Sequence, residues 1–345
     1  MTADAAPESH NGITKEEFDV YDRQIRLWGL EAQNALRSSS VLLVGLSPLG
    51  AEVTKNLMLC GLGSLTISDS KYVNEDDIVS NFLLQDEAKI NRAVASAAKV
   101  KSLNPMVEFK ALERGIGDFG EDELKQYHLI ILIDEPYDVV NKMDTFCRQN
   151  RIKFMAGSVY GWFGYAFVDF DQHSFLMKQP KQHAVAELEA EGDSTTAVAH
   201  TTIEDDIFEK RQLDYPTFEA AFNVDWAAKK YLRKAKRLVP PSYAYVRAIL
   251  RAEQQKISLD NMVEMKRLFN KERENIRQAE IIPDWSEKDA MFTTGPQLSP
   301  VAAIVGGTMG QEAIKALSEG ECPLHNIFIY SAPHTTGHIL HYPPE

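Results

Sequence analysis

VLLVGLSPLG, residues 41–50, is the stretch of sequence that decides the fold. Its apolar start predicts a buried strand, and an apolar helical pattern follows as far as residue 60. A strand, a G-x-G-x-x-G turn and a helix form the unit that holds nucleotide phosphates at the helix amino terminus. Gly45 and Gly50 keep the outer glycines, but Ser47 replaces the middle one and Pro48 offers no N–H. The residues predict the fold of such a unit. They leave two interpretations of its pocket open: weakened nucleotide binding, or a structural turn without a ligand.

Apolar strands alternate with helical patterns on the carboxyl side of this turn. We expect strands at 64–69, 106–110, 128–134 and 152–157, and helices at about 89–102 and 137–149. The alternation returns after residue 300, with a small-residue helix followed by strands in NIFIYS and GHILHY. This order is typical of an α/β chain with a parallel, doubly wound, Rossmann-like sheet. The small residues at 302–310 suit an internal packing face or a dimer seam, and we favour the core.

The chain divides into an α/β domain and an insertion. We expect residues 1–14 to be disordered, residues 15–170 and 296–345 to form the Rossmann-like domain, and residues 171–295 to form a mostly helical insertion. Residues 187–209 hold eight acidic residues and no Lys or Arg, which predicts a mobile loop. The basic run at 229–237 is typical of a solvated helix face, with a nuclear import signal as the alternative.

Composition excludes several classes of function. The 345 residues include 37 Lys plus Arg and 50 Asp plus Glu, for a net charge of −13, which argues against a nucleic-acid partner. No apolar run approaches the roughly 20 residues of a membrane helix. Cys60, Cys147 and Cys322 form no CxxC pair, so we expect neither a zinc site nor a disulfide framework. A reducing compartment, cytosol or nucleus, follows.

Asp69 ends the second expected strand about 20 residues after the glycine turn, where a ribose-binding acid belongs in dinucleotide-binding folds. A nicotinamide dehydrogenase is therefore conceivable. It is disfavoured because no proton-transfer group stands out. His128 opens an apolar strand, which is typical of a packing residue.

Four segments resemble the adenylating enzymes that activate ubiquitin-like proteins. They are YDRQIRLWGLEAQNALRSSSVLLVG at 21–45, ISDSKYVNEDDIVSNFLLQ at 67–85, LNPMV at 103–107 and VGGTMGQEAIKALS at 305–318. The resemblance covers about 1–170 and 296–345 and implies a Rossmann-like adenylation fold. The chain length and residues 21–31 are most similar to the smaller, non-thiolating subunits of heterodimers that activate the modifier SUMO. By the same resemblance, 171–295 corresponds to a catalytic-cysteine half domain that lacks its cysteine.

The resemblance also implies a degenerate nucleotide pocket, formed by Gly45, Gly50, Asp69, Asn81 and Arg92. In the family's S-N-x-x-R-Q segment, Ser80, Asn81 and Gln85 remain, but Leu84 stands at the arginine position. Arg92 falls near the family's phosphate-binding lysine. The Mg-binding aspartate position falls at Tyr137, with Asp138 one residue away, and a tyrosine cannot replace a hard carboxylate ligand. We expect no metal on this chain and Mg-ATP bound mainly by the partner subunit.

Arg23 matches the N-terminal residue with which one half of such a dimer reaches the ATP of the other half. We therefore expect Arg23 to act in trans on an ATP phosphate in the partner's site. The alternative is a surface ion pair, which we expect for Arg26 and Arg37. No cysteine lies in the family's C-T-x-x-x-x-P context. The thioester is thus expected on the larger subunit.

The implied partners are that larger thiolating subunit, SUMO and, indirectly, the SUMO-conjugating enzyme, and the implied location is the nucleus. Two further functions stay open. One is a self-sufficient homodimeric adenylating enzyme of the bacterial sulfur-carrier type (ThiF/MoeB-like). The other is a non-catalytic scaffold or nucleotide-sensing module. The losses at Ser47, Leu84 and Tyr137 speak against the homodimeric enzyme.

Overall fold

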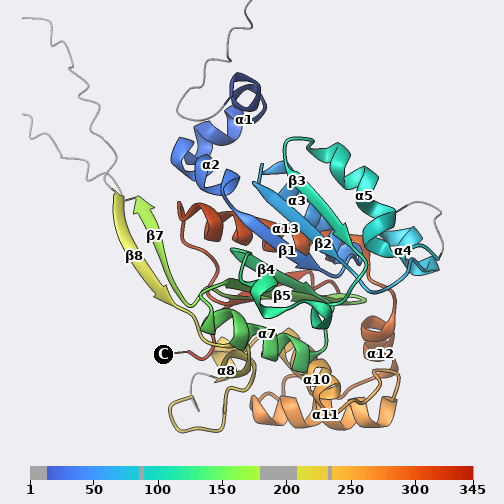
Figure 1. Cartoon of the computed structure of the whole chain (residues 1–345). Helices are drawn as coiled ribbons and strands as arrows, with labels where there is room; N and C mark the ends of the chain where they lie inside the picture. The colour runs from blue at the N-terminus through green and yellow to red at the C-terminus, as the bar shows by residue number, and fades with distance from the viewer. Residues whose placement is uncertain (1–13, 85–88, 179–207, 232–234, 345) are drawn as a thin grey trace, which may run out of the picture.

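An eight-stranded mixed sheet runs through the molecule, with helices on both faces (Figure 1). The computed structural model describes residues 14–84, 89–178, 208–231 and 235–344. Residues 1–13, and residues 187–207 of the acidic segment, lie outside these ranges, so the disorder predicted there is not addressed. The strands are β1 (Ser40–Val44), β2 (Ser64–Ser68), β3 (Glu108–Leu112), β4 (Leu129–Ile133), β5 (Lys153–Tyr160), β6 (Phe163–Asp169), β9 (Ile327–Ser331) and β10 (Thr336–Leu340).

The strand order is β10-β9-β6-β5-β4-β1-β2-β3. The five strands from β3 to β5 in this order are parallel, which confirms the doubly wound fold. The other three, β6, β9 and β10, are antiparallel to their neighbours, so the prediction of a parallel sheet was wrong for this edge. For β6 the physical reason is the tight turn at Gly161 and Trp162 between β5 and β6. A connection of two residues joins only antiparallel strands.

Two helical layers cover the sheet. The principal helices are α1 (Lys15–Trp28), α2 (Leu30–Arg37), α3 (Pro48–Leu59), α4 (Glu75–Ser80), α5 (Arg92–Leu103), α6 (Glu121–Leu124), α7 (Tyr137–Gln149), α8 (Phe218–Phe222), α9 (Ala235–Leu238), α10 (Pro241–Gln254), α11 (Met262–Asn275), α12 (Glu287–Thr294) and α13 (Ser299–Ser318), with a 3₁₀ turn at Ile116–Asp118. One apolar core joins α3 and α13 to the sheet, and the other joins α7, α10 and α11 to the opposite face. Within the described residues, no helix is both long and apolar enough to cross a bilayer.

The small residues of α13 form a packing face against α3. A Cβ on Gly306 would lie 2.6 Å from the Glu52 Cβ, and a Cβ on Gly310 would lie 2.6 Å from the Asn56 Cβ. Ala302 is buried as well, whereas Ala303 is exposed and nothing lies within 4 Å of a Cβ on Gly307. The core interpretation of 302–310 is therefore confirmed for the face that meets α3.

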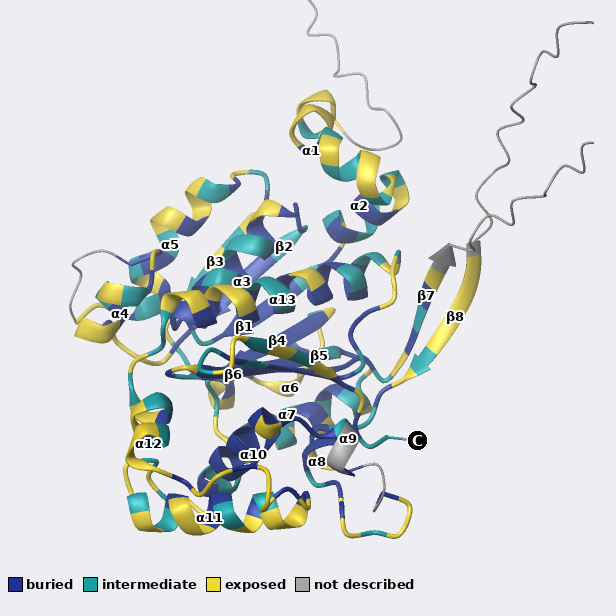
Figure 2. Ribbon diagram, turned by 180° about the vertical axis from the view of Figure 1, so that it is seen from behind, coloured by how far each residue is buried: buried dark blue, intermediate teal, exposed yellow. Residues whose placement is uncertain are grey.

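The insertion packs its helices on the sheet but does not begin with a helix. Two antiparallel strands, β7 (Gln172–Lys178) and β8 (Phe208–Asp214), form a ribbon that projects from the body (Figure 1). The mostly helical prediction missed this ribbon, and Glu209, placed in a mobile loop, lies in β8. Period-2 apolar alternation is the signal for a strand, and the charged sequence FEKRQLD of β8 lacks it. Beyond the ribbon, α10 is almost wholly buried, and α11 and α12 carry the exposed outer surface (Figure 2).

Helix α1 is attached at the amino-terminal edge of the sheet. Its predicted capping box between Thr14 and Glu17 is present. Tyr21, 2% exposed, accepts a hydrogen bond from Asn104 Nδ2 at 2.7 Å and packs on Gly61. Gln24 Nε2 donates to the Leu59 carbonyl, at the last residue of α3. Helix α1 therefore lies at the carboxyl end of α3, whereas the glycine turn lies at its amino end.

Candidate functional site: a cleft at the carboxyl end of β1

The glycine turn between β1 and α3 has the expected geometry. Gly45 has φ +102°, and a Cβ there would lie 2.3 Å from the Ile133 carbonyl oxygen. A Cβ on Gly50 would lie 2.0 Å from the Gly45 carbonyl oxygen. Both glycines are therefore required for close approach of backbone to backbone. Their role is to build the turn.

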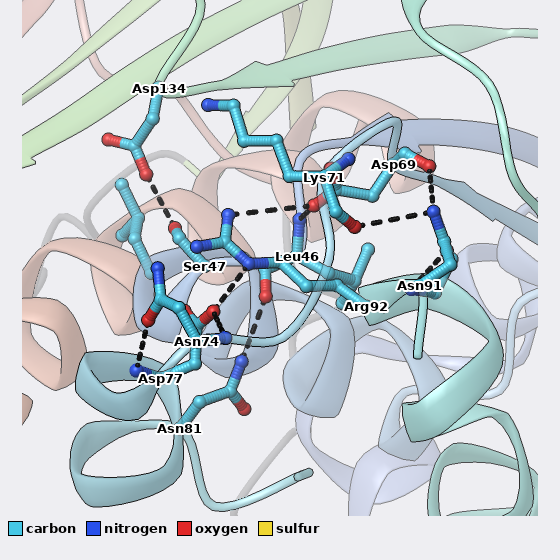
Figure 3. A network of polar contacts seen from close by, with 12 residues as sticks. Leu46, Ser47, Asp69, Lys71, Asn74, Asp77, Asn81, Asn91, Arg92 and Asp134 are labelled. Atoms are coloured by element: carbon cyan, nitrogen blue, oxygen red, sulfur yellow. Dashed lines mark hydrogen bonds and ion pairs between the residues drawn. The ribbon is translucent and has the colours of Figure 1, made fainter. Parts of the chain in front are cut away.

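Asp69 and Asn81 also serve the turn (Figure 3). The Asp69 carboxylate accepts hydrogen bonds from the backbone N–H groups of Leu46, at 2.6 Å, and Lys71, at 2.7 Å. Asn81 Nδ2 donates to the Leu46 carbonyl at 2.8 Å. Asp69 is 3% exposed and Asn81 2% exposed. Both lie beside the turn as predicted, but their polar atoms are already engaged by the chain itself.

A cleft of about 280 Å³ opens beside this turn. Its walls come from the start of α3, the segment from β2 to α4, the start of α5, the end of β4, the end of β5 and the loop before α13. Of the five predicted pocket residues, Arg92 lines the cleft, and Gly45, Gly50, Asp69 and Asn81 lie behind it. The prediction therefore found the neighbourhood of the site and one residue of its surface.

Arg92 is held by carboxylates of its own chain (Figure 3). Its Nε donates to Asp77 Oδ2 at 2.7 Å, and its Nη1 lies 3.9 Å from Asp69 Oδ2. The side chain is 11% exposed. Leu84, at the position where the family has arginine, is buried and supplies no charge, and Gln85 lies outside the described residues. The guanidinium that the resemblance assigned to phosphate is thus already neutralised.

Asp134 lines the cleft and was missed by the sequence reasoning. It directly follows β4, with φ +52°. Its Oδ2 accepts hydrogen bonds from Ser47 Oγ at 2.5 Å and Gln297 Nε2 at 2.7 Å, and its Oδ1 accepts from the Val159 N–H at 3.1 Å. Burial raises the pKa of this carboxyl, and the three hydrogen bonds offset only part of that effect. Its place in the sequence was a usable signal, because ligands of open α/β sheets bind beyond the carboxyl ends of the strands.

Tyr137 and Asp138, the two predicted positions for a metal-binding acid, point elsewhere. Tyr137 is buried in the core under α8, where its hydroxyl accepts a hydrogen bond from Asn223 Nδ2 at 3.0 Å. Asp138 is exposed and lines a different groove. Among the described residues no group of three His, Cys, Asp or Glu side chains could hold a metal ion. Neither of these two positions therefore supplies a carboxylate to the cleft.

A half-buried carboxyl connects the cleft to the insertion. Glu253 on α10 accepts a hydrogen bond from the hydroxyl of Tyr160, a cleft residue, at 2.6 Å and from the Tyr137 N–H at 3.2 Å. Burial raises the pKa of Glu253 to about 7, although both hydrogen bonds lower it. No pattern in the sequence marks Glu253, because its partners come from distant segments.

Comparison with known proteins identifies the family. Residues 21–344 match the ThiF family. The chain belongs to the ThiF family. It is 37% identical to the "SUMO-activating enzyme subunit aos-1" of Caenorhabditis elegans, over 96% of this chain and 99% of that protein. It is 36% identical to the human and 35% identical to the bovine "SUMO-activating enzyme subunit 1", each over 94% of both chains. The family resemblance deduced from the motifs is confirmed.

Arg23 of this ThiF-family chain is exposed on α1. Within the described residues its side chain makes no ion pair or hydrogen bond, whereas Arg26 pairs with Asp22 at 3.0 Å and Arg37 with Glu17 at 2.9 Å. The ion pairs expected for these two neighbours are confirmed. Helix α3 has 12 residues, and at 1.5 Å per residue its ends are about 18 Å apart. Because α1 lies at the end of α3 remote from the cleft, Arg23 lies far from its own chain's site.

The three cysteines of the ThiF-family chain are free thiols. Cys60 is 2% exposed, and burial raises its pKa to about 12. Cys147 is fully buried, and burial likewise raises its pKa. Cys322 is exposed as expected, but partial burial of its sulfur raises its pKa too. A reactive cysteine needs the thiolate, so none of these settings favours nucleophilic attack.

Proposed function

We propose that this chain is the smaller, non-thiolating subunit of a heterodimeric SUMO-activating enzyme. The names and near-complete coverage of its relatives support the assignment. One structural observation carries the division of labour: Arg23 is exposed, its side chain is unpaired among the described residues, and it lies at the end of α3 remote from its own chain's cleft. The chain thus keeps a phosphate-binding group that it cannot use itself.

Arg23 completes the ATP site of the larger subunit in trans. Its planar guanidinium carries a permanent charge and binds phosphate oxygens bidentately. When the modifier's C-terminal carboxylate attacks the α-phosphate, pyrophosphate leaves and negative charge grows on the leaving group. A cation placed there stabilises the transition state more than the ground state. By analogy with arginine fingers, its loss lowers the rate by about 10³-fold, or about 4 kcal/mol.

The thioester forms on the larger subunit. This chain's cysteines are buried or have raised pKa values, and the partner accordingly provides the nucleophile and most of the contacts to Mg-ATP. The chain alone is inactive on this account. The SUMO-conjugating enzyme is an indirect partner, and the nucleus is the proposed location. Both rest on the resemblance, and part of the basic run at 229–237 lies outside the described residues.

ATP–pyrophosphate exchange tests the proposal. The purified chain alone should show no exchange, and the heterodimer with SUMO should show robust exchange. Arg23→Ala should lower the heterodimer rate by about 10³-fold, and Arg23→Lys should recover part of it. Arg26→Ala is the matched control, because Arg26 lies one helical turn away and is paired with Asp22. ATP–pyrophosphate exchange by the chain alone would favour the self-sufficient homodimeric enzyme. An unchanged rate in the heterodimer with Arg23→Ala would rule out the role of Arg23 and favour a non-catalytic scaffold.

A further inference from the structure

The amino terminus of α3 is occupied by side chains of its own chain. The N–H groups at such a terminus bind anions. Here Pro48 removes one donor, and the Leu49 N–H donates to Gln297 Oε1 at 3.3 Å. Ser47, the N-cap residue, makes no cap hydrogen bond to the helix. Its hydroxyl donates instead to Asp134.

Gln297 and Asp134 form one connected unit. Gln297 lies two residues before α13, and its amide bridges the Leu49 N–H and Asp134 Oδ2. Asp134 is held in turn by Ser47 and the Val159 N–H. Three segments far apart in the sequence therefore converge where a phosphate would meet the helix.

We propose that Gln297 and Asp134 act as an intramolecular ligand of this cleft and are the residues that exclude nucleotide phosphates from it. This deepens the proposed function, in which the cleft is unused, by naming what closes it. Three carboxylates, Asp76, Asp77 and Asp134, line the cleft against two cations, Lys71 and Arg92, so the lining charge is 2 − 3 = −1. The cleft therefore offers a triphosphate no excess of positive charge. The amide oxygen of Gln297 occupies the position at the Leu49 N–H that a phosphate oxygen would take.

The variant Gln297→Ala/Asp134→Asn removes both parts of this ligand. It frees the Leu49 N–H and removes one negative charge. We expect the full-length variant chain to bind ATP and pyrophosphate at least tenfold more tightly than the wild type in isothermal titration. The matched control is Gln212→Ala/Asp214→Asn, because Gln212 and Asp214 form the same kind of pair at 3.3 Å on the exposed strand β8. No gain in the cleft variant, or an equal gain in the control, would overturn the proposal.

A milder variant covers the case in which the double variant does not fold. Gln297→Ala alone keeps the contact between Ser47 and Asp134. It should bind pyrophosphate several-fold more tightly than the wild type and should speed hydrogen exchange at the Leu49 amide. An unchanged Leu49 amide with unchanged binding would count against the intramolecular ligand. These measurements use the chain alone, so they are independent of the exchange assay with Arg23→Ala, and either proposal can fail without the other.

Discussion

Gly61→Ala should release helix α1 from the body without touching α1 itself. Gly61 follows α3 and has φ +79°, a backbone conformation that L-residues rarely adopt. A Cβ at this position would lie 2.5 Å from Tyr21 Cζ and 2.7 Å from Tyr21 Oη. Tyr21 is the buried anchor of α1. The substitution therefore combines backbone strain with a direct clash against the residue that holds α1 in place.

The structure sets the size of this effect. A left-handed conformation costs a non-glycine residue roughly 1–2 kcal/mol, and overpacking costs typically about 1–3 kcal/mol. Together they give roughly 2–5 kcal/mol. Loss of a buried aromatic anchor is worth about 3–5 kcal/mol, which sets the scale of what Tyr21 contributes. The cost of Gly61→Ala and the contribution of the Tyr21 anchor therefore overlap. Detachment of α1 from the body then competes with a strained structure in which Tyr21 stays buried.

Hydrogen exchange of the α1 amides measures the release. Gly61→Ala should lower protection across Lys15–Trp28 by at least tenfold, since each 1.4 kcal/mol is a factor of ten. Tyr21→Ala should do the same. In the Tyr21→Ala background, Gly61→Ala should add little to the loss in α1, because the clash partner is gone. Unchanged protection in Gly61→Ala, or full additivity of the two substitutions, would refute the reasoning. The rate of ATP–pyrophosphate exchange by a heterodimer carrying Gly61→Ala should fall less than the rate of one carrying Arg23→Ala, because the Arg23 guanidinium is still present.

Three further predictions concern stability and thiol chemistry. Burial and the neighbouring Asp169 raise the pKa of Asp144 to about 8. The contribution of this group to the free energy of unfolding is therefore complete below about pH 4 and is lost as the pH rises towards 8. Asp144→Asn should flatten that decline, measured by urea unfolding across this pH range. Gly310→Ala, whose Cβ would meet Asn56, should destabilise by about 1–3 kcal/mol, whereas Gly307→Ala, in open space on the same helix, should stabilise by roughly 0.5–1 kcal/mol. Replacing Cys60, Cys147 and Cys322 together with alanine should leave a SUMO thioester on the larger subunit, seen as a band lost on reduction.

The fold was predictable wherever local pattern and burial coincide. The apolar runs before Gly45 and at 128–134 became β1 and β4, two neighbouring interior strands, because fully buried parallel strands are continuously apolar. Pattern failed where pairing depends on a turn or on a partner strand. The two-residue connection at Gly161 reversed the direction of β6, and β8 pairs with β7 despite its charged sequence.

The residues that line the cleft were less predictable than the residues that build the glycine turn beside it. Asp134 and Gln297 are 163 positions apart in the sequence, and no local pattern around either residue predicts their contact. The resemblance predicts the Mg-binding position at Tyr137, yet α7 begins at that residue and turns its side chain into the core. Asp134, which does line the cleft, lies three residues earlier, directly after the strand.

Motif residues in this chain therefore report on the fold more than on the ligand. Gly45, Gly50 and Asp69 keep their identities because the backbone needs them: each contacts main-chain atoms that close the turn. The positions that would contact phosphate are those that differ or are engaged, namely Ser47, Pro48 and Arg92. A turn of this kind stays under the same packing constraints whether or not it binds anything. Arg23 is under no such constraint from the described part of its own chain, and for that reason its chemistry is the better guide to function.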